Sequence, residues 1–176
     1  IAMSALADGF EVVNYRPGVV VFDYDRDGDM DFYITSEVGH SNFLYRNEGD
    51  GSFANVATAA GVMAVQSNSS GAIACDLNND GYQDLYVGAR GVMGDELDFR
   101  SAGQDRAASK DTLFLNNRDG TFTDITASAI GDAVNLRSAG SIACADVDGD
   151  GWLDLYVGNV IDEDFWIFDQ PSHPGH

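Results

Sequence analysis

The stretch Asp23-Tyr24-Asp25-Arg26-Asp27-Gly28-Asp29-Met30-Asp31 is the first of three copies of one nine-residue pattern. The second copy is Asp76-Leu77-Asn78-Asn79-Asp80-Gly81-Tyr82-Gln83-Asp84, and the third is Asp146-Val147-Asp148-Gly149-Asp150-Gly151-Trp152-Leu153-Asp154. Each copy carries oxygen-bearing side chains at positions one, three, five and nine, with glycine at position six. A hard cation such as Ca²⁺ takes about six to eight oxygen ligands, and a loop with this alternation can wrap around one. The glycine permits the sharp turn that directs the position-seven carbonyl inward.

The pattern therefore predicts three Ca²⁺ sites, one in each copy. An acidic hairpin turn without metal is the alternative, but carboxylates packed this closely would repel one another in the absence of a cation. The predicted ligands are Asp23, Asp25, Asp27, Asp29 and Asp31 in the first copy; Asp76, Asn78, Asp80, Tyr82 and Asp84 in the second; and Asp146, Asp148, Asp150, Trp152 and Asp154 in the third. The position-seven residues (Asp29, Tyr82 and Trp152) would contribute their carbonyl oxygens.

These copies differ from the EF-hand calcium loop. An EF-hand requires a bidentate glutamate at position 12, where this chain has Ile34, Val87 and Val157. The flanking segments are also short β-branched and aromatic runs bounded by Gly and Asp, which predict strands rather than helices. Each copy is thus expected to join two antiparallel strands: 18–22 with 31–35, 71–75 with 84–88, and 141–145 with 154–158.

A second motif follows each of the first two predicted hairpins. Phe43–Asn47 leads through a Gly-rich turn to Ser52–Ala57, and Thr112–Asn116 leads through a similar turn to Thr121–Thr126. Two further antiparallel strands are predicted in each case. The repeating unit is therefore an all-β, four-stranded antiparallel sheet of the kind that forms the blades of a β-propeller.

At this point the chain resembles the FG-GAP/VCBS repeat family, the calcium-loop propeller blades also found in integrin α-chains. The motifs D-x-D-x-D-G-x-x-D-[FL]-Y-[IV] and N-x-x-D-G-[ST]-F carry the resemblance, which covers roughly residues 8–168. It implies propeller blades, structural Ca²⁺, an extracellular setting and adhesive or scaffolding work, without implying any one activity.

One propeller-repeat domain is predicted over residues 1–176, with about three blades. Its parts are a spare N-terminal strand within 1–17, blade 1 over 18–67, blade 2 over 68–136, a partial blade 3 over 137–168 and a tail over 169–176. We expect Ala7–Val13 of one molecule to complete blade 3 of the next, because an unpaired strand edge is a template for pairing. Such head-to-tail exchange gives a ring or a filament; a fragment of a larger propeller is the alternative.

The composition is strongly acidic, with 29 acidic against 9 basic residues and a net charge of −20. Such a surface repels nucleic acid and anionic membranes. Three bound Ca²⁺ would offset only part of this charge, leaving −14 (−20 plus 6). The sequence has no stretch of eighteen apolar residues, so no transmembrane helix is predicted. Calcium loops of low affinity suit the calcium concentration outside cells.

Two cysteines, Cys75 and Cys144, lie at the ends of corresponding strands, one residue out of register with each other. A small buried thiol in each is the favoured interpretation over a disulfide between neighbouring units. A polar insertion over 89–111 is expected on the face opposite the calcium loops, either as a binding loop or as a solvated excursion or packing strut.

No catalytic constellation is present in the sequence: the histidines His40, His173 and His176 are scattered, and the carboxylates are explained by calcium. The chain is therefore predicted not to be an enzyme but a calcium-stabilised extracellular scaffold that associates with itself. The alternatives are a carbohydrate-binding or adhesion module with a glycan or an extracellular protein as partner, and a propeller portion of a larger secreted protein.

Overall fold

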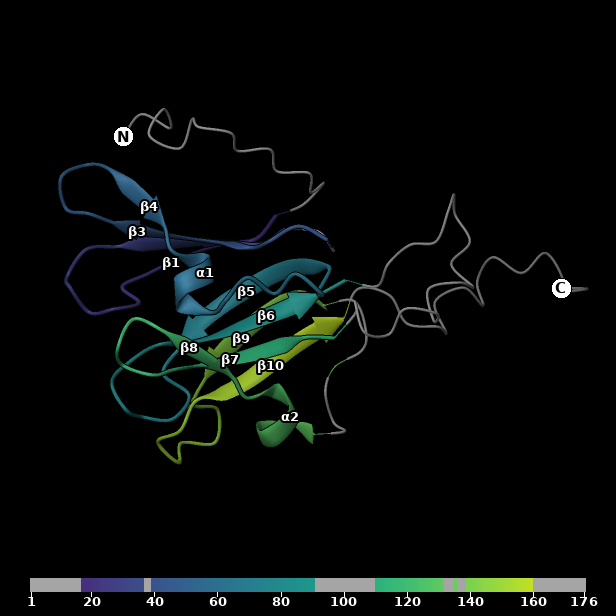
Figure 1. The fold of residues 1–176 in the computed structure, drawn as a ribbon. Coiled ribbons are helices and arrows are strands. Elements are labelled where there is room, and N and C mark those ends of the chain that lie inside the picture. Colours follow the sequence, from purple (N-terminus) through teal and green to yellow (C-terminus); the bar gives the residue numbers. More distant parts are fainter. Residues whose placement is uncertain (1–16, 37–38, 91–109, 132–134, 136–138, 160–176) are drawn as a thin grey trace, which may run out of the picture.

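The computed structural model describes residues 17–36, 39–90, 110–131, 135 and 139–159 (Figure 1). Three predicted segments lie outside these residues: the N-terminal strand over 8–13, the third strand of blade 3 over 165–168, and the tail over 169–176. The insertion over 89–111 is described only at its two ends. These ends, Ala89 and Asp111, lie at the end of the sheet away from the aspartate loops (Figure 1).

Two four-stranded antiparallel sheets and one two-stranded sheet follow one another along the chain. In the first sheet the strands lie in the order β1-β2-β3-β4, and in the second in the order β5-β6-β7-β8. Their bounds are β1 Val19–Phe22, β2 Asp31–Ile34, β3 Phe43–Asn47, β4 Phe53–Asn55, β5 Ser69–Cys75, β6 Asp84–Ala89, β7 Thr112–Asn116 and β8 Phe122–Asp124. The third sheet pairs β9 Ala139–Ala145 with β10 Asp154–Asn159. The prediction of all-β, propeller-type blades is confirmed.

The registers show why each nine-residue pattern forms a closed hairpin loop. Phe22 pairs with Asp31, Cys75 with Asp84, and Ala145 with Asp154. The last carboxylate of every loop is therefore already the first residue of the returning strand. The position-six glycines have φ of 96°, 89° and 90°, a left-handed conformation that favours glycine.

Two short helices replace the ends of the predicted fourth strands. The strands were expected to reach Ala57 and Thr126, but helix α1 spans Ala57–Ala60 and helix α2 spans Thr126–Ala129. The cause is a local turn: Asn55 Oδ1 accepts a hydrogen bond from Ala57 N (3.2 Å), and Asp124 Oδ1 accepts one from Thr126 N (2.9 Å). No helix in the described part of the chain is long and apolar enough to cross a membrane.

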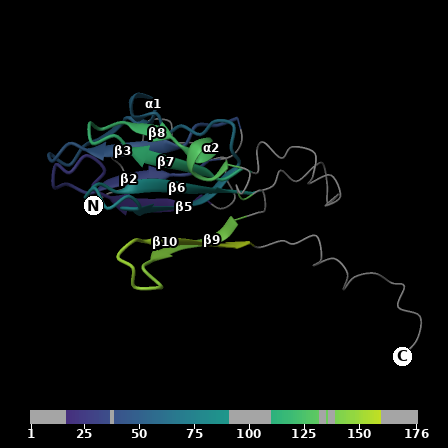
Figure 2. The ribbon, with the colours of Figure 1, turned by 90° about the horizontal axis from the view of Figure 1, so that it is seen from below.

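The first strands of successive blades lie side by side, with β5 between β1 and β9 (Figures 1 and 2). Hydrogen bonds connect neighbouring blades here: Ser69 N donates to Ser36 O (3.0 Å), and Ser70 Oγ donates to Ala139 O (2.9 Å). A Cβ added to Gly18 would lie 2.8 Å from the Cα of Gly71, so the close approach of β1 to β5 requires glycine.

The hydrophobic core lies mainly between the first two blades. Tyr33, Leu44 and Val62 come from the first repeat and Leu85 and Val87 from the second, and all five are fully buried. Tyr156 of β10 corresponds to the buried Tyr33 and Tyr86 but is 51% exposed. The face that β10 presents is thus uncovered among the described residues.

Cys75 and Cys144 form a disulfide that joins β5 to β9, and the prediction of two buried thiols is therefore wrong. The two strands lie side by side as first strands of adjacent blades, with the cysteine Cα atoms 6.8 Å apart. This separation is at the upper end of the range that a disulfide spans. The one-residue offset between the motifs does not prevent the bond, because adjacent blades pack strand against strand rather than pairing in register.

Candidate metal loops and their surroundings

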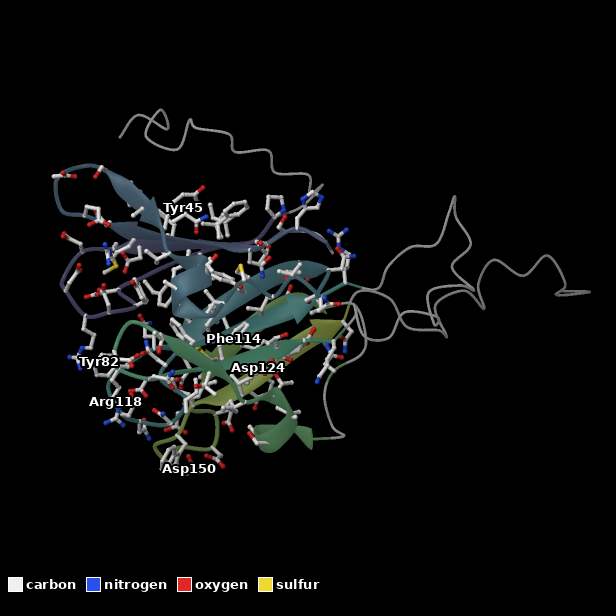
Figure 3. The ribbon with its side chains drawn as sticks, viewed as in Figure 1. Tyr45, Tyr82, Phe114, Arg118, Asp124 and Asp150 are labelled. Carbon is white, nitrogen blue, oxygen red and sulfur yellow. A yellow bond between two sulfur atoms is a disulfide. The ribbon has the colours of Figure 1, made fainter. Side chains whose placement is uncertain are left out.

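The three aspartate loops lie at the same end of the three sheets (Figure 1). Figure 3 shows Tyr82 of the second loop and Asp150 of the third at this end, together with Arg118 from the turn between β7 and β8. The antiparallel hairpins place them there, because every first strand runs in the same direction toward its loop. The fold thereby gathers most of the predicted ligands on one face of the molecule.

The position-nine carboxylate anchors each loop. Asp31 Oδ2 accepts a hydrogen bond from Tyr24 N (3.1 Å), and its Oδ1 accepts one from Asn47 N (2.8 Å). In the second loop Asp84 makes the same two bonds, with Leu77 N (3.1 Å) and Asn116 N (3.0 Å). Asp31 and Asp84 are both buried, and burial raises the pKa of each carboxyl, that of Asp31 to about 6.

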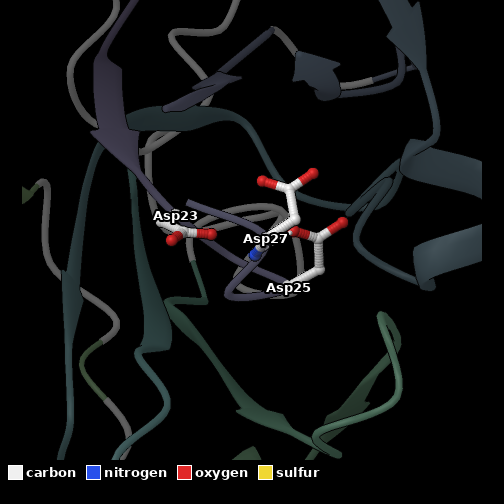
Figure 4. A group of neighbouring side chains, drawn as sticks. All are labelled: Asp23, Asp25 and Asp27. Atoms are coloured by element: carbon white, nitrogen blue, oxygen red, sulfur yellow. Dashed lines mark hydrogen bonds between the residues drawn. The ribbon is translucent and has the colours of Figure 1, made fainter. Parts of the chain in front are cut away.

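The first loop brings three carboxylates together. One oxygen from each of Asp23, Asp25 and Asp27 lies within 4.8 Å of the others (Figure 4). Burial raises the pKa of Asp25, and the negative charge of Asp27 adds to that shift. Asp23 Oδ2 accepts a hydrogen bond from Gly28 N (3.1 Å), but its Oδ1 is buried without any hydrogen-bond partner. It is the only such side-chain oxygen or nitrogen among the described residues.

The second loop, which the structure describes in full, does not bring three carboxylates this close. Its position-three residue is Asn78, whose amide nitrogen donates to Asp80 Oδ2 (2.9 Å). Asp76 accepts hydrogen bonds from the backbone N–H groups of Asp80 (2.9 Å) and Gly81 (2.8 Å). Asp80 also accepts a bond from Arg118 Nε (2.9 Å), so a protein cation already reaches this loop.

The third loop again brings three carboxylates within 4.8 Å of one another, those of Asp146, Asp148 and Asp154. Asp146 accepts hydrogen bonds from the N–H groups of Gly149 (2.7 Å) and Gly151 (3.0 Å). This loop is more exposed than the other two. The sequence prediction placed Asp150 in the same ligand set, but Asp150 lies outside this close group of three carboxylates.

Positions five and seven are connected in the same way in every loop. The position-seven N–H donates to the position-five aspartate: Asp29 to Asp27 (2.9 Å), Tyr82 to Asp80 (2.8 Å) and Trp152 to Asp150 (2.8 Å). These bonds fold the chain around the carboxylates. The carbonyl oxygens of Asp29, Tyr82 and Trp152 stay predicted ligands.

The residues of the first and third loops fit a hard divalent cation. Their donors are carboxylate oxygens, which Ca²⁺ prefers, and a cation would supply the buried Asp23 Oδ1 with its missing partner. Its positive charge would also oppose the raised pKa of Asp25, because an adjacent cation stabilises an ionised carboxylate. The side chains of Asp23, Asp25, Asp27, Asp146, Asp148 and Asp154 would hold such an ion.

Sequence analysis missed a pair of equivalent buried polar residues, Asn42 and Asp111, which directly precede β3 and β7. Asn42 Oδ1 accepts a bond from Ser36 N (2.6 Å), and Asp111 Oδ1 accepts one from Ala89 N (2.6 Å). Each also bonds the tyrosine hydroxyl of its own blade, Asn42 as a donor to Tyr33 (2.8 Å) and Asp111 as an acceptor from Tyr86 (2.7 Å). The sequence feature that could have identified these two residues is a polar residue directly before the third strand in both repeats.

A recess of about 450 Å³ lies between the first loop and the turn that joins β7 to β8. Two arginines line it, and both are paired: Arg46 with Glu48 (2.7 Å) and Arg118 with Asp80 (2.9 Å). Tyr24 also lines the recess but is only 3% exposed, so its ring offers no open stacking surface.

The fold and the loops define a class: tandem four-stranded blades of propeller type, each with an aspartate loop between its first two strands. The chain belongs to the FG-GAP-like repeat family, whose model matches residues 16–87 and 97–157. It is also similar to cartilage acidic protein 1 of Mus musculus (29% identical over 158 residues) and of Xenopus tropicalis (29% over 160). The human protein is 28% identical over 158 residues. Each alignment covers 84% of this chain and 22% of the relative.

Proposed function

We propose that this chain is a calcium-stabilised extracellular scaffold made of propeller blades, with no enzymatic activity of its own. One observation carries the proposal: the buried, unpartnered Asp23 Oδ1 lies in a group of three carboxylates. A buried polar atom without a partner is costly, and a cation at this point removes that cost. The family membership supports the same assignment, because the loop pattern is the one that FG-GAP repeats share.

Two observations support an extracellular location. Cys75 and Cys144 form a disulfide, and disulfides persist in oxidising compartments but are rare in the cytosol. The relatives are named for cartilage, and the same name describes them as acidic, as this chain is with its net charge of −20.

Isothermal titration calorimetry of the full chain with CaCl₂ tests the metal assignment. The proposal expects saturable binding of three Ca²⁺ per chain: the converging carboxylates support a site in the first and third loops, and the sequence pattern alone predicts one in the second. Asp23→Asn should remove or weaken one site at least tenfold, since truncating a buried charge interaction costs roughly 1.5–3 kcal/mol. Asp50→Asn is the matched control, because Asp50 lies in an exposed turn outside the loops and an asparagine keeps its Oδ1 acceptor for Ser52. Absence of saturable calcium binding in the unmodified chain would refute the assignment.

Self-association through the two end blades is a further part of the proposal. Its support is exposed apolar surface: Val19 (58%) and Val21 (55%) on β1, and Tyr156 (51%) on β10. The third blade also lacks a predicted fourth strand of its own, and an unpaired strand edge is a template for pairing. The strand exchange expected for Ala7–Val13 stays a proposal. Light scattering after size exclusion tests it, since deletion of residues 1–14 should give a monomer, whereas unchanged association would contradict exchange.

A carbohydrate-binding or adhesion module is the alternative function. The observation that favours it is the polar recess between the first loop and the β7–β8 turn, where Arg118 and Thr121 could donate hydrogen bonds to a sugar. A glycan array probed in calcium would test this alternative. Hits that Arg118→Ala abolishes would support the alternative, and an array without hits would remove it.

A further inference from the structure

We propose that the position-four residue of the first loop and that of the second each reach into the following loop, so that calcium binding at neighbouring loops is thermodynamically coupled. Arg26 connects the first loop to the second, and Asn79 connects the second to the third. This inference rests on the proposed calcium binding, which it extends from three separate sites to a connected row.

The backbone conformation at position four directs these side chains. Arg26 has a φ of 61° and Asn79 a φ of 53°, both in the left-handed region. Position four of the third loop is Gly149, with a φ of 78°. Left-handed backbone is unfavourable for a bulky residue such as arginine. Arginine therefore disfavours the backbone conformation that the loop requires, and its presence indicates that its side chain makes a contact outside the loop.

That contact is with the second loop. The guanidinium carbon of Arg26 lies 5.1 Å from the centroid of the Tyr82 ring, within the range of a cation–π interaction. A Cβ added to Gly81 would lie 3.0 Å from a terminal nitrogen of Arg26, so the guanidinium also covers the backbone at Gly81. Gly81 and Tyr82 occupy positions six and seven, the part of the loop that must turn to present its carbonyl to the ion.

The second loop repeats this arrangement toward the third. Asn79 Nδ2 donates a hydrogen bond of 2.8 Å to the carbonyl oxygen of Gly151, which is position six of the third loop. The next residue, Trp152, donates its N–H to Asp150 (2.8 Å) and carries the predicted carbonyl ligand. Position four of one loop therefore contacts position six or seven of the following loop in both pairs of neighbours.

Coupling follows from these contacts. Closure of a loop around an ion fixes the backbone at position four, which in turn holds the turn of the next loop in place. By linkage the effect is reciprocal, so an ion in the later loop also favours closure of the earlier one. A neutral hydrogen bond such as that of Asn79 corresponds to roughly a two- to tenfold effect on affinity.

The third loop provides a site-specific readout, because Trp152 is part of it and is 52% exposed. The chain has two tryptophans, so Trp166→Phe gives a background in which Trp152 reports the third loop alone. The experiment is a calcium titration of the full chain, with its disulfide intact, followed by Trp152 fluorescence. Four proteins form a double-mutant cycle: the background, Asn79→Gly, Asp76→Asn and the double variant.

Asn79→Gly keeps the left-handed conformation without strain and removes only the side chain that reaches Gly151. The proposal expects it to raise the calcium midpoint of the third loop about two- to tenfold. Asp76→Asn, which impairs the second site, should also raise that midpoint, but should have no further effect once Asn79 is replaced. Equal midpoints in all four proteins, or independent effects of the two substitutions, would overturn the coupling while leaving calcium binding intact. A background protein without any calcium response would overturn the proposed calcium binding as well.

Discussion

At the scale of single residues, Asp111 is a buried carboxylate without a cationic partner among the described residues. It accepts hydrogen bonds from Ala89 N (2.6 Å), the Tyr86 hydroxyl (2.7 Å) and Asn135 Nδ2 (2.7 Å). These bonds favour the ionised form, but burial is the larger influence and raises the pKa of Asp111 above its ordinary value. The corresponding residue of the first blade, Asn42, performs the same structural role without a charge.

Asp111→Asn should therefore remove a pH-dependent contribution to stability. Since the pKa of Asp111 is higher in the folded chain than the unfolded value of about 3.9, its contribution is most favourable below that value and declines as pH rises through the folded pKa. The variant loses the hydrogen bond from Asn135 at every pH. Its free energy of unfolding should nevertheless rise relative to that of the parent chain as pH increases above about 4. Urea unfolding of both proteins from pH 4 to pH 8 measures the difference, and a constant difference would contradict the raised pKa.

The convergence of carboxylates in the first loop could be predicted at this scale, because the spacing of the aspartates places alternate side chains on the same side of a tight loop. Asp23, Asp25 and Asp27 alternate so that their carboxylates converge, as the structure finds. The hydrogen bond from Asn78 to Asp80 could not be predicted, because an amide at position three is compatible with either a ligand or an internal donor.

At the scale of elements, glycine sets how closely the strands of one blade approach the next. A Cβ added to Gly88 on β6 would lie 2.7 Å from the Cβ of Ala139 and 2.8 Å from Cδ1 of Ile142. The equivalent glycine of β10, Gly158, has no neighbouring atom closer than 3.7 Å among the described residues. Neither glycine has a positive φ, so only the packing distinguishes them.

Gly88→Ala should destabilise the chain by about 1–3 kcal/mol through overpacking, because Ala139 lies on a paired strand and cannot move freely. Gly158→Ala is the matched control and should change the free energy of unfolding by less than about 0.5 kcal/mol. Chemical denaturation of both variants in calcium compares them directly. Equal effects would show that β6 and β9 do not pack as described.

The strands were predictable because short runs of β-branched and aromatic residues end at Gly and Asp boundaries. Helices α1 and α2 were not, since four residues carry too little periodicity to indicate a helix. Asn55 and Asp124 were the usable signals, because their side chains turn the chain two residues later.

At the scale of the whole molecule, the Cys75–Cys144 disulfide joins two blades across 69 residues of sequence. A cross-link of this span restricts the unfolded chain and stabilises the folded one by about 4 kcal/mol on a loop-entropy estimate. The sequence favoured two thiols over this bond, because which first strands lie side by side follows from blade packing and not from any local pattern.

Replacing both cysteines by serine should lower the free energy of unfolding by about 2–5 kcal/mol. Urea denaturation in calcium, with the parent chain under reducing and non-reducing conditions, measures the loss. The parent chain should become less stable on reduction, whereas the double variant should be insensitive to the reductant. A parent chain that reduction leaves unchanged would show that the bond does not connect the blades in solution.

Calcium is proposed to hold this array of acidic loops together, and thermal unfolding in CaCl₂ compared with unfolding in EGTA decides whether it does. At a calcium concentration ten times the dissociation constant, each site adds about 1.4 kcal/mol, so three sites add about 4 kcal/mol. We expect an unfolding midpoint at least about 8 °C higher in calcium than in EGTA, and a smaller increase in magnesium. An unfolding midpoint that is the same in calcium and in EGTA would contradict it.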